Sequence, residues 1–177
     1  MKGLEKWLNS NEYPVTFFII ADLFENATFV KWLQQILTRF SQRITIGNHG
    51  FSHRSWSAWP QDIEGFDNAL AESNRILLQQ CGDNFRPWFR APAGYIAPWM
   101  APVLAKNGFK VDSSVNPSWL VKRKAGKTKS WTQVLQSMND NNIIEIDWKT
   151  KWTLPINGPA LHLPILKIIA NSSWKSS

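Results

Sequence analysis

The feature of this sequence that most restricts its fold is an uninterrupted, β-rich apolar run from Val15 to Ile20. A run of this length is typical of a strand that is covered on both faces of a sheet. Apolar residues from Phe29 to Phe40 then recur at helical spacing, with Asn26 or Thr28 available as the N-cap of a helix. A buried strand followed by an amphipathic helix indicates a parallel sheet or a (β/α) barrel.

The rest of the chain repeats this alternation. Further helices are predicted at residues 4–11, at 62–80 with Gly82 as the stop, and from Pro98 to Gly108. Very short strands are predicted at 88–89 and 109–111. The central expectation for the sheet is that three segments form parallel strands within it: Thr16–Ile20, Arg43–Ile46 and Ile143–Ile146.

The composition is that of a globular protein, with 44% apolar and 19% charged residues, and we expect residues 1–177 to form one domain. The formal net charge of +7 indicates a basic surface, which suits nucleic acid, anionic membranes or acidic polymers. The basic residues are scattered, however, and we expect no nucleic-acid partner. The densest basic cluster is interpreted as a solvated loop and comprises Lys122, Arg123, Lys124, Lys127 and Lys129.

Several classes of site are excluded by simple counts. The single cysteine, Cys81, excludes an internal disulfide and a multi-cysteine zinc site, and its place at a helix end favours a buried structural thiol. The first residues do not resemble a signal peptide, which makes the cytoplasm the default compartment. No apolar run approaches the roughly 18 residues that span a bilayer, so no transmembrane segment is expected. The oligomeric state is left open.

Tryptophan is unusually frequent, with eleven residues. Core packing accounts for most tryptophans in globular proteins, because the indole buries a large apolar area. Exposed tryptophans can instead stack against sugar rings, and Trp56 and Trp59 are the candidates for that role.

The most informative segment is Ile46–His53, which contains two of the three histidines, His49 and His53. It directly follows a predicted strand, and loops at the carboxyl ends of barrel strands carry active sites. If the segment turns as a helix, side chains four residues apart share a face and can bind one metal ion. The alternative is a pair of loop histidines that bond to backbone carbonyl groups, and spacing alone favours neither interpretation.

Two further segments carry candidate polar groups. Arg90 follows a short strand in a turn fixed by proline and glycine, where it could hold a carboxylate through paired hydrogen bonds. A structural ion pair in a surface loop is the alternative for this residue. Asp112 stands at a strand end, where an acidic residue is more often a turn cap than a catalytic group.

Taken together and in this order, the segments resemble the polysaccharide deacetylases of the NodB homology class, carbohydrate esterase family 4. Residues 48–53 resemble the metal-binding His-x-x-x-His motif, with Gly50 where serine or threonine is usual. Residues 90–94 resemble the Arg-Pro-Pro-Tyr-Gly motif, with Ala93 in place of the aromatic residue, and residues 107–114 resemble the fourth motif. The resemblance extends from about Leu4 to Ile169. It implies an α/β fold of the distorted, incomplete (β/α) barrel type.

Two departures from the family pattern affect the expected activity. The family begins with a Thr-Phe-Asp-Asp-Gly strand that supplies the general base and the third metal ligand, and no such motif precedes Thr16. We therefore expect a domain shortened at its N-terminus or at both ends, with little or no activity. The family also uses a Leu-x-His motif whose histidine is the general acid. Leu161-His162 only approximates it, so His162 is either that acid or a histidine packed among apolar neighbours.

The resemblance implies a hydrolase that removes N-acetyl groups from an amino-sugar polysaccharide. It implies zinc, or another divalent metal, bound by His49 and His53, with Arg90 orienting the base and Asp112 tuning the acid His162. By motif position the backbone N–H of Ala93 would hold the oxyanion. Two other functions stay open: a catalytically inactive carbohydrate-binding module on the same fold, and a hydrolase of small amides.

Overall fold

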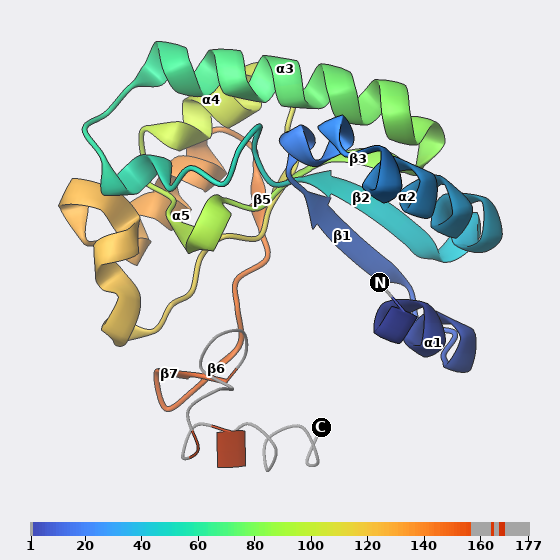
Figure 1. Ribbon diagram of the computed structural model, residues 1–177. Coiled ribbons are helices and arrows are strands. Elements are labelled where there is room, and N and C mark those ends of the chain that lie inside the picture. Colours follow the sequence, from blue (N-terminus) through green and yellow to red (C-terminus); the bar gives the residue numbers. More distant parts are fainter. Residues whose placement is uncertain (1, 157–163, 165–166, 169–177) are drawn as a thin grey trace.

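The computed structural model describes residues 2–156, 164 and 167–168. Five strands form one parallel sheet in the order β1-β2-β3-β4-β5, namely Val15–Ile19, Ile44–Asn48, Phe85–Phe89, Val111–Asp112 and Ile144–Glu145. β1 and β5 are the two edges, so the described strands form an open sheet (Figure 1). The expectations that the three predicted segments are parallel strands of one sheet, and that the fold is an incomplete (β/α) barrel, are confirmed.

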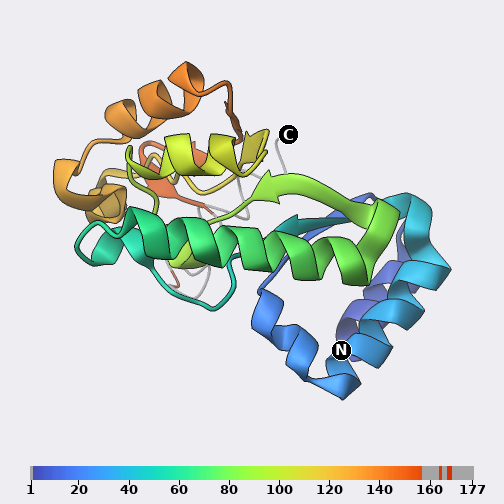
Figure 2. The ribbon, with the colours of Figure 1, turned by 90° about the horizontal axis from the view of Figure 1, so that it is seen from above.

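Five α-helices accompany the sheet, namely α1 (Lys2–Ser10), α2 (Ala27–Phe40), α3 (Ile63–Cys81), α4 (Met100–Lys106) and α5 (Trp131–Asp140). The long helix α3 runs beside the sheet and contacts β2 and β3, as both views of the ribbon show (Figures 1 and 2). Asn26 caps α2 by accepting a hydrogen bond from Phe29 N at 3.0 Å. Asp62 caps α3 in the same way, and Gly82, with a positive φ of +49°, ends it. After β5, the strands Thr150–Lys151 (β6) and Leu154–Pro155 (β7) form a separate antiparallel hairpin.

Some boundaries differ from the sequence prediction. β4 contains only Val111 and Asp112, whereas β3 is longer than predicted and includes Pro87. Proline has no backbone N–H to donate, and the β2–β3 register is irregular where Pro87 lies between Phe85 and Phe89. The helix α5 was not predicted, although Ser130 caps it and its buried residues Trp131, Val134 and Met138 recur at helical spacing.

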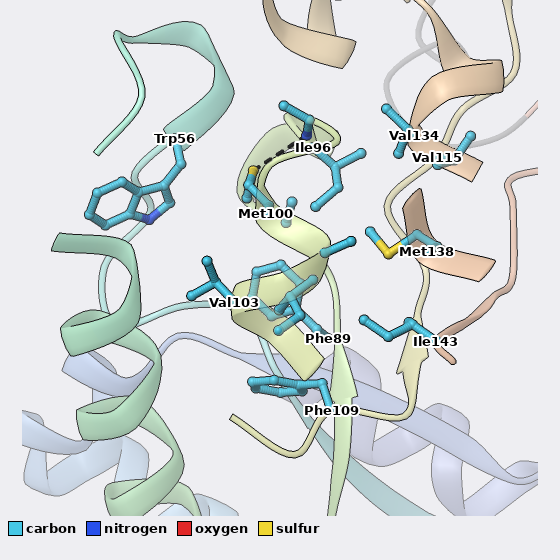
Figure 3. Close-up of a cluster of buried hydrophobic side chains, with 14 of the residues drawn as sticks. Trp56, Phe89, Ile96, Met100, Val103, Phe109, Val115, Val134, Met138 and Ile143 are labelled. Carbon is cyan, nitrogen blue, oxygen red and sulfur yellow. Dashed lines mark hydrogen bonds between the residues drawn. The ribbon is translucent and has the colours of Figure 1, made fainter. Parts of the chain in front are cut away.

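The larger group of buried side chains lies under α3, α4 and α5, with Phe89, Met100 and Phe109 among its largest members (Figure 3). Trp56 belongs to this group and is only 6% exposed, with its ring 5.4 Å from that of Phe66. The prediction that Trp56 is an exposed sugar platform is therefore wrong. Trp59, by contrast, is 61% exposed.

Most of the basic cluster is exposed, as expected: Lys122, Arg123, Lys127 and Lys129 are exposed, and only Lys124 is half-buried. The segment is not irregular, however, because residues 119–128 form a 3-10 segment, η6 (Trp119–Thr128), in which Ala125 is fully buried. Cys81 is buried, as expected, and burial raises the pKa of its thiol to about 12. None of the helices in the described part of the chain is both long enough and apolar enough to cross a membrane.

Candidate functional site

The loops at the carboxyl edge of the sheet are joined by backbone hydrogen bonds. Ala21 N, just after β1, donates to Gly50 O at 3.0 Å, and Arg90 N, just after β3, donates to Asn48 O at 3.0 Å. Ser113 N, just after β4, donates to Phe89 O at 2.9 Å. Because parallel strands end on the same edge, these bonds bring the predicted site residues of three strands together.

The two histidine rings after β2 lie side by side. The ring centroids of His49 and His53 are 5.4 Å apart, with an angle of 65° between the ring planes. The segment that holds them is a bend rather than a helix. Gly50 has a φ of +90°, a left-handed conformation that favours glycine, which explains why serine or threonine is absent here.

A hydrogen bond fixes the tautomer of His49. Its Nδ1 lies 2.6 Å from the carbonyl oxygen of Arg90, and a carbonyl only accepts, so Nδ1 carries the proton. The lone pair of the ring is therefore on Nε2. Burial lowers the pKa of His49 and outweighs the hydrogen bond to the Arg90 carbonyl, which raises it, while the nearby His53 and Arg90 side chains also lower it. A neutral imidazole whose other nitrogen is bonded to a backbone carbonyl is the form that binds metals in proteins.

The two histidines have the geometry to supply two of the ligands of one divalent metal ion. Zn–N bonds of about 2.0–2.1 Å at a tetrahedral angle place two imidazole centroids roughly 5 Å apart, close to the observed separation. Within the described residues, no third histidine, cysteine or carboxylate completes a cluster with them. Asp22 lies on the adjacent loop, where its backbone N–H donates to Phe51 O at 2.9 Å.

Asn48 is a site residue that the sequence prediction did not assign a role. It is fully buried at the end of β2, and its Nδ2 donates to Ser73 Oγ at 2.7 Å and Asn74 Oδ1 at 2.9 Å. Its Oδ1 accepts from Gly50 N at 2.6 Å. The side chain thus ties the histidine loop to α3.

Arg90 does not make the predicted paired bond to a carboxylate. Its Nε donates to Ser113 O at 2.9 Å and its Nη2 donates to Ser113 Oγ at 2.8 Å. The guanidinium also lies between two aromatic rings, 4.5 Å from the centroid of Phe18 and 5.3 Å from that of Trp148. Trp148 Nε1 donates to the same Ser113 carbonyl at 3.0 Å. The arginine is therefore held rigidly across the ends of β1, β3 and β4.

Behind Arg90 lies a buried pair of carboxyl groups, Asp112 and Glu145, which are direct partners in the β4–β5 register. Glu145 Oε1 accepts from Val115 N at 3.0 Å, while its Oε2 is buried without an ordinary donor. Burial, the charge of Asp112 and a hydrogen bond to it raise the pKa of Glu145 to about 11. Burial also raises the pKa of Asp112, against the opposing effects of Glu145, Ser114 and Arg90. The raised pKa of Glu145 keeps this carboxyl group protonated near neutral pH.

Glu145 was not predicted as a site residue, because residues 143–146 read only as a strand. Asp112 was predicted as a site residue. It also caps a turn, as the alternative interpretation of this residue expects. Its Oδ1 accepts from Ser114 N at 2.9 Å and its Oδ2 from Ser114 Oγ at 2.7 Å. Ser114 Oγ in turn accepts from Ala91 N at 2.7 Å, which links the aspartate to the turn after β3.

That turn contains Ala93, whose φ of +52° is uncommon for a residue with a Cβ atom. Lys124 of the η6 segment donates from Nζ to Ala93 O at 2.7 Å. The remaining predicted site residue, His162, lies outside the described residues, so its role stays a prediction.

The comparisons assign the chain to a protein family. The chain matches the polysaccharide deacetylase family over residues 2–112, more than half of its length, and so belongs to that family. Membership supports a deacetylase-type hydrolase, and the family is generally metal-dependent.

Among solved structures, a candidate polysaccharide deacetylase from Mycobacterium smegmatis is similar, with 22% identity and a TM-score of 0.47. The match covers 59% of this chain and 34% of that one, so this chain spans about a third of the mycobacterial structure. No curated protein matches the chain.

Proposed function

We propose that this chain is a metal-dependent hydrolase that removes N-acetyl groups from an amino-sugar polysaccharide, with His49 and His53 binding one zinc or other divalent ion. The observation that carries the proposal is the hydrogen bond from His49 Nδ1 to Arg90 O, which leaves Nε2 free to bind, beside the ring of His53. The alternative of two histidines that both serve only as backbone donors does not account for this close pairing of the rings.

A bound zinc ion supplies Lewis acidity and lowers the pKa of a bound water to about 7. The protein groups around it have separate roles. The backbone N–H of Ala93 would hold the oxyanion that develops when the acetamide carbonyl is attacked. Arg90 supplies a fixed positive charge at the same edge of the sheet. Asp112 is fully buried and bonded to Ser114, so it acts as a positioning residue and does not touch the substrate. His162 is proposed as the acid that protonates the leaving amine.

Catalytic zinc sites normally have three protein ligands, whereas the described residues supply two. We therefore expect the 177-residue chain to bind zinc weakly and to turn over slowly. An extension ahead of Met1 that bears Thr-Phe-Asp-Asp-Gly would provide the third ligand and a base, and should raise acetate release by orders of magnitude. An extension with asparagine at both aspartate positions is the matched control.

The deciding experiment measures acetate release from chitin oligomers by the extended chain, with zinc added, for the variants His49→Ala and His53→Ala. Both variants should lose activity and zinc together. A third variant, Trp59→Ala, separates the enzyme from an inactive sugar-binding module on the same fold, which the exposure of Trp59 favours. If oligomers bind the extended chain in a Trp59-dependent way but no acetate appears, the module is correct and the hydrolase is wrong. Release of acetate from small amides but not from chitin oligomers would instead indicate a small-amide hydrolase.

A further inference from the structure

A second polar and aromatic site is formed partly by the loops that carry the candidate site residues. A cavity of about 550 Å³ is lined by residues that include Trp59, Pro60, Tyr95, Arg123 and Lys127. A second cavity of about 220 Å³ shares Trp59 and Lys127 with it. Because they share these lining residues, the two cavities are treated together as one recess at the exposed side chain of Trp59.

The walls of this recess extend from the two loops that carry the candidate site. Trp59 follows His53 by six residues, and Tyr95 follows Ala93 by two. Lys124 joins these loops to the η6 segment, because its Nζ donates to Ala93 O at 2.7 Å and lies 5.5 Å from the centroid of the Tyr95 ring. Its carbonyl oxygen accepts from Ser57 Oγ at 2.7 Å. The recess is therefore fixed relative to the turn at Ala93.

Close packing around Gly126, in η6, also indicates that the recess is fixed in position. Gly126 lines both cavities and has a φ of +73°. A Cβ atom at this position would lie 2.9 Å from the Cβ of Ala97, which real contacts do not allow. Glycine lets η6 approach the chain after Tyr95 closely enough to hold Arg123 and Lys127 over the cavity.

The chemistry of the lining is that of a site for an acidic sugar. An exposed indole such as Trp59 offers a flat apolar face to a sugar ring, while its N–H stays available to a polar partner. The charged residues that line the larger cavity are Arg123 and Lys127, both exposed, and neither cavity is lined by a carboxylate. A guanidinium binds a carboxylate through two parallel hydrogen bonds, which gives both charge and orientation.

We propose that this recess, formed by Trp59, Tyr95, Arg123 and Lys127, is a binding subsite for a sugar unit that carries a carboxylate. The inference rests on the proposed function and narrows its substrate class to an acidic N-acetylated polysaccharide. It also gives a role to part of the net charge of +7. Trp59 stacks on the sugar ring, and Arg123 with Lys127 pairs the carboxylate.

The test compares binding of two probes by calorimetry at low ionic strength: hyaluronan oligosaccharides, which are acidic and N-acetylated, and neutral chitin hexamers. The unmodified chain should bind the acidic probe more tightly, and added salt should weaken that binding. The double variant Arg123→Ala/Lys127→Ala should lose about ten-fold or more in affinity for the acidic probe and little for the neutral one. Trp59→Ala should weaken binding of both probes.

Matched control variants remove the same kinds of side chain, two basic residues and one tryptophan, at positions outside the recess. Lys31→Ala/Arg39→Ala removes two exposed charges from α2, and Trp152→Ala removes an indole that is 74% exposed on the hairpin. Neither should change affinity for either probe. Equal affinity of the unmodified chain for the two probes, or an unchanged affinity in the Arg123/Lys127 variant, would overturn the proposal. Tighter binding of a single-stranded deoxythymidine decamer than of hyaluronan would overturn it in favour of a nucleic-acid site.

Measurements of sugar binding and of zinc binding distinguish a failure of the subsite from a failure of the proposed hydrolase function. His49→Ala should lose zinc yet keep its affinity for the acidic probe, because the recess does not include the histidines. If zinc binding requires His49 and His53 but the recess binds no acidic sugar, only the subsite is wrong. If the recess binds acidic sugar but the histidines bind no metal, the hydrolase is wrong and the subsite stands as a binding site alone.

Discussion

Glu145 lies directly opposite Asp112 across the β4–β5 pair, and burial beside the Asp112 carboxyl group raises the pKa of Glu145 to about 11. Glu145 is therefore a neutral acid behind Arg90 at neutral pH. Because its pKa is raised, Glu145 keeps a proton in the folded state that it releases in the unfolded state at the same pH. The free energy of unfolding therefore depends on pH.

The free energy of unfolding should fall as pH rises. Because the pKa of Glu145 is raised from 4.5 to about 11, the folded chain holds more protons than the unfolded chain between these values. This contribution to the free energy of unfolding is fully present below pH 4.5 and is lost as the pH rises towards about 11. For one proton, the loss is at most about 1.4 kcal/mol per pH unit. Glu145→Gln keeps a neutral hydrogen-bond donor and should flatten the curve.

Urea denaturation between pH 5 and pH 9 measures this dependence. Glu12→Gln, which changes an exposed glutamate, should leave the slope unchanged. An identical slope in Glu145→Gln and the unmodified chain would show that the pKa of Glu145 is not raised in the folded state.

The two tryptophans that the sequence could not separate should behave oppositely on substitution. Trp56→Ala removes a side chain that packs on Phe66 in the core and should cost about 3–5 kcal/mol in the free energy of unfolding. Trp59→Ala removes a side chain that is mostly exposed and should change stability by no more than about 0.5 kcal/mol. Chemical denaturation of both variants checks the pair, and equal losses would contradict the described packing.

The sequence was sufficient for local features and insufficient for long-range ones. The strand at Val15–Ile19 and the cap at Asn26 follow from apolar runs and capping chemistry that are visible within a few residues. Whether Trp56 or Trp59 faces the core depends on where α3 lies, which no local pattern specifies. The signals for α5, a capping serine and helical spacing of apolar residues, are local, and the sequence contains both of them.

In the candidate site, too, local features could be predicted from the sequence and long-range contacts could not. The spacing of His49 and His53 indicated a pair, and the structure brings their rings together. The partner of Arg90 was predicted as a carboxylate and is Ser113, because the end of β4 presents its serine, not its aspartate, to the guanidinium. Glu145 is 33 residues from Asp112 in sequence, and only the register of two short strands pairs them.

Arg90→Lys should destabilise the chain even though the charge is kept. Lysine cannot reproduce the two bonds to Ser113 or the stacking between Phe18 and Trp148, so a loss of about 1–3 kcal/mol is expected. Arg86→Lys, an exposed change in the same strand, is the control and should be nearly neutral. Thermal unfolding measures both, and a neutral Arg90→Lys would mean that these contacts contribute little.

Asn48→Ala should weaken metal binding without removing a metal ligand. The variant leaves Gly50 N without its buried acceptor and frees the histidine loop from α3, at a cost of about 1–3 kcal/mol. Metal affinity should fall by about ten-fold or more, as for other groups that orient ligands. Asn139→Ala, on the exposed face of α5, is the control. Calorimetric titration with zinc measures the affinity, and unchanged zinc affinity in Asn48→Ala would show that the loop does not need this anchor.

The central claim is that His49 and His53 bind the same metal ion. X-ray absorption spectroscopy of the zinc-loaded chain tests it most directly, with His162→Ala as the control that removes the third histidine. The account predicts two imidazole nitrogens at about 2.0–2.1 Å from zinc in the unmodified chain and in His162→Ala, and fewer in His49→Ala and His53→Ala. A spectrum without two imidazoles, or one that His49→Ala and His53→Ala leave unchanged, would contradict it.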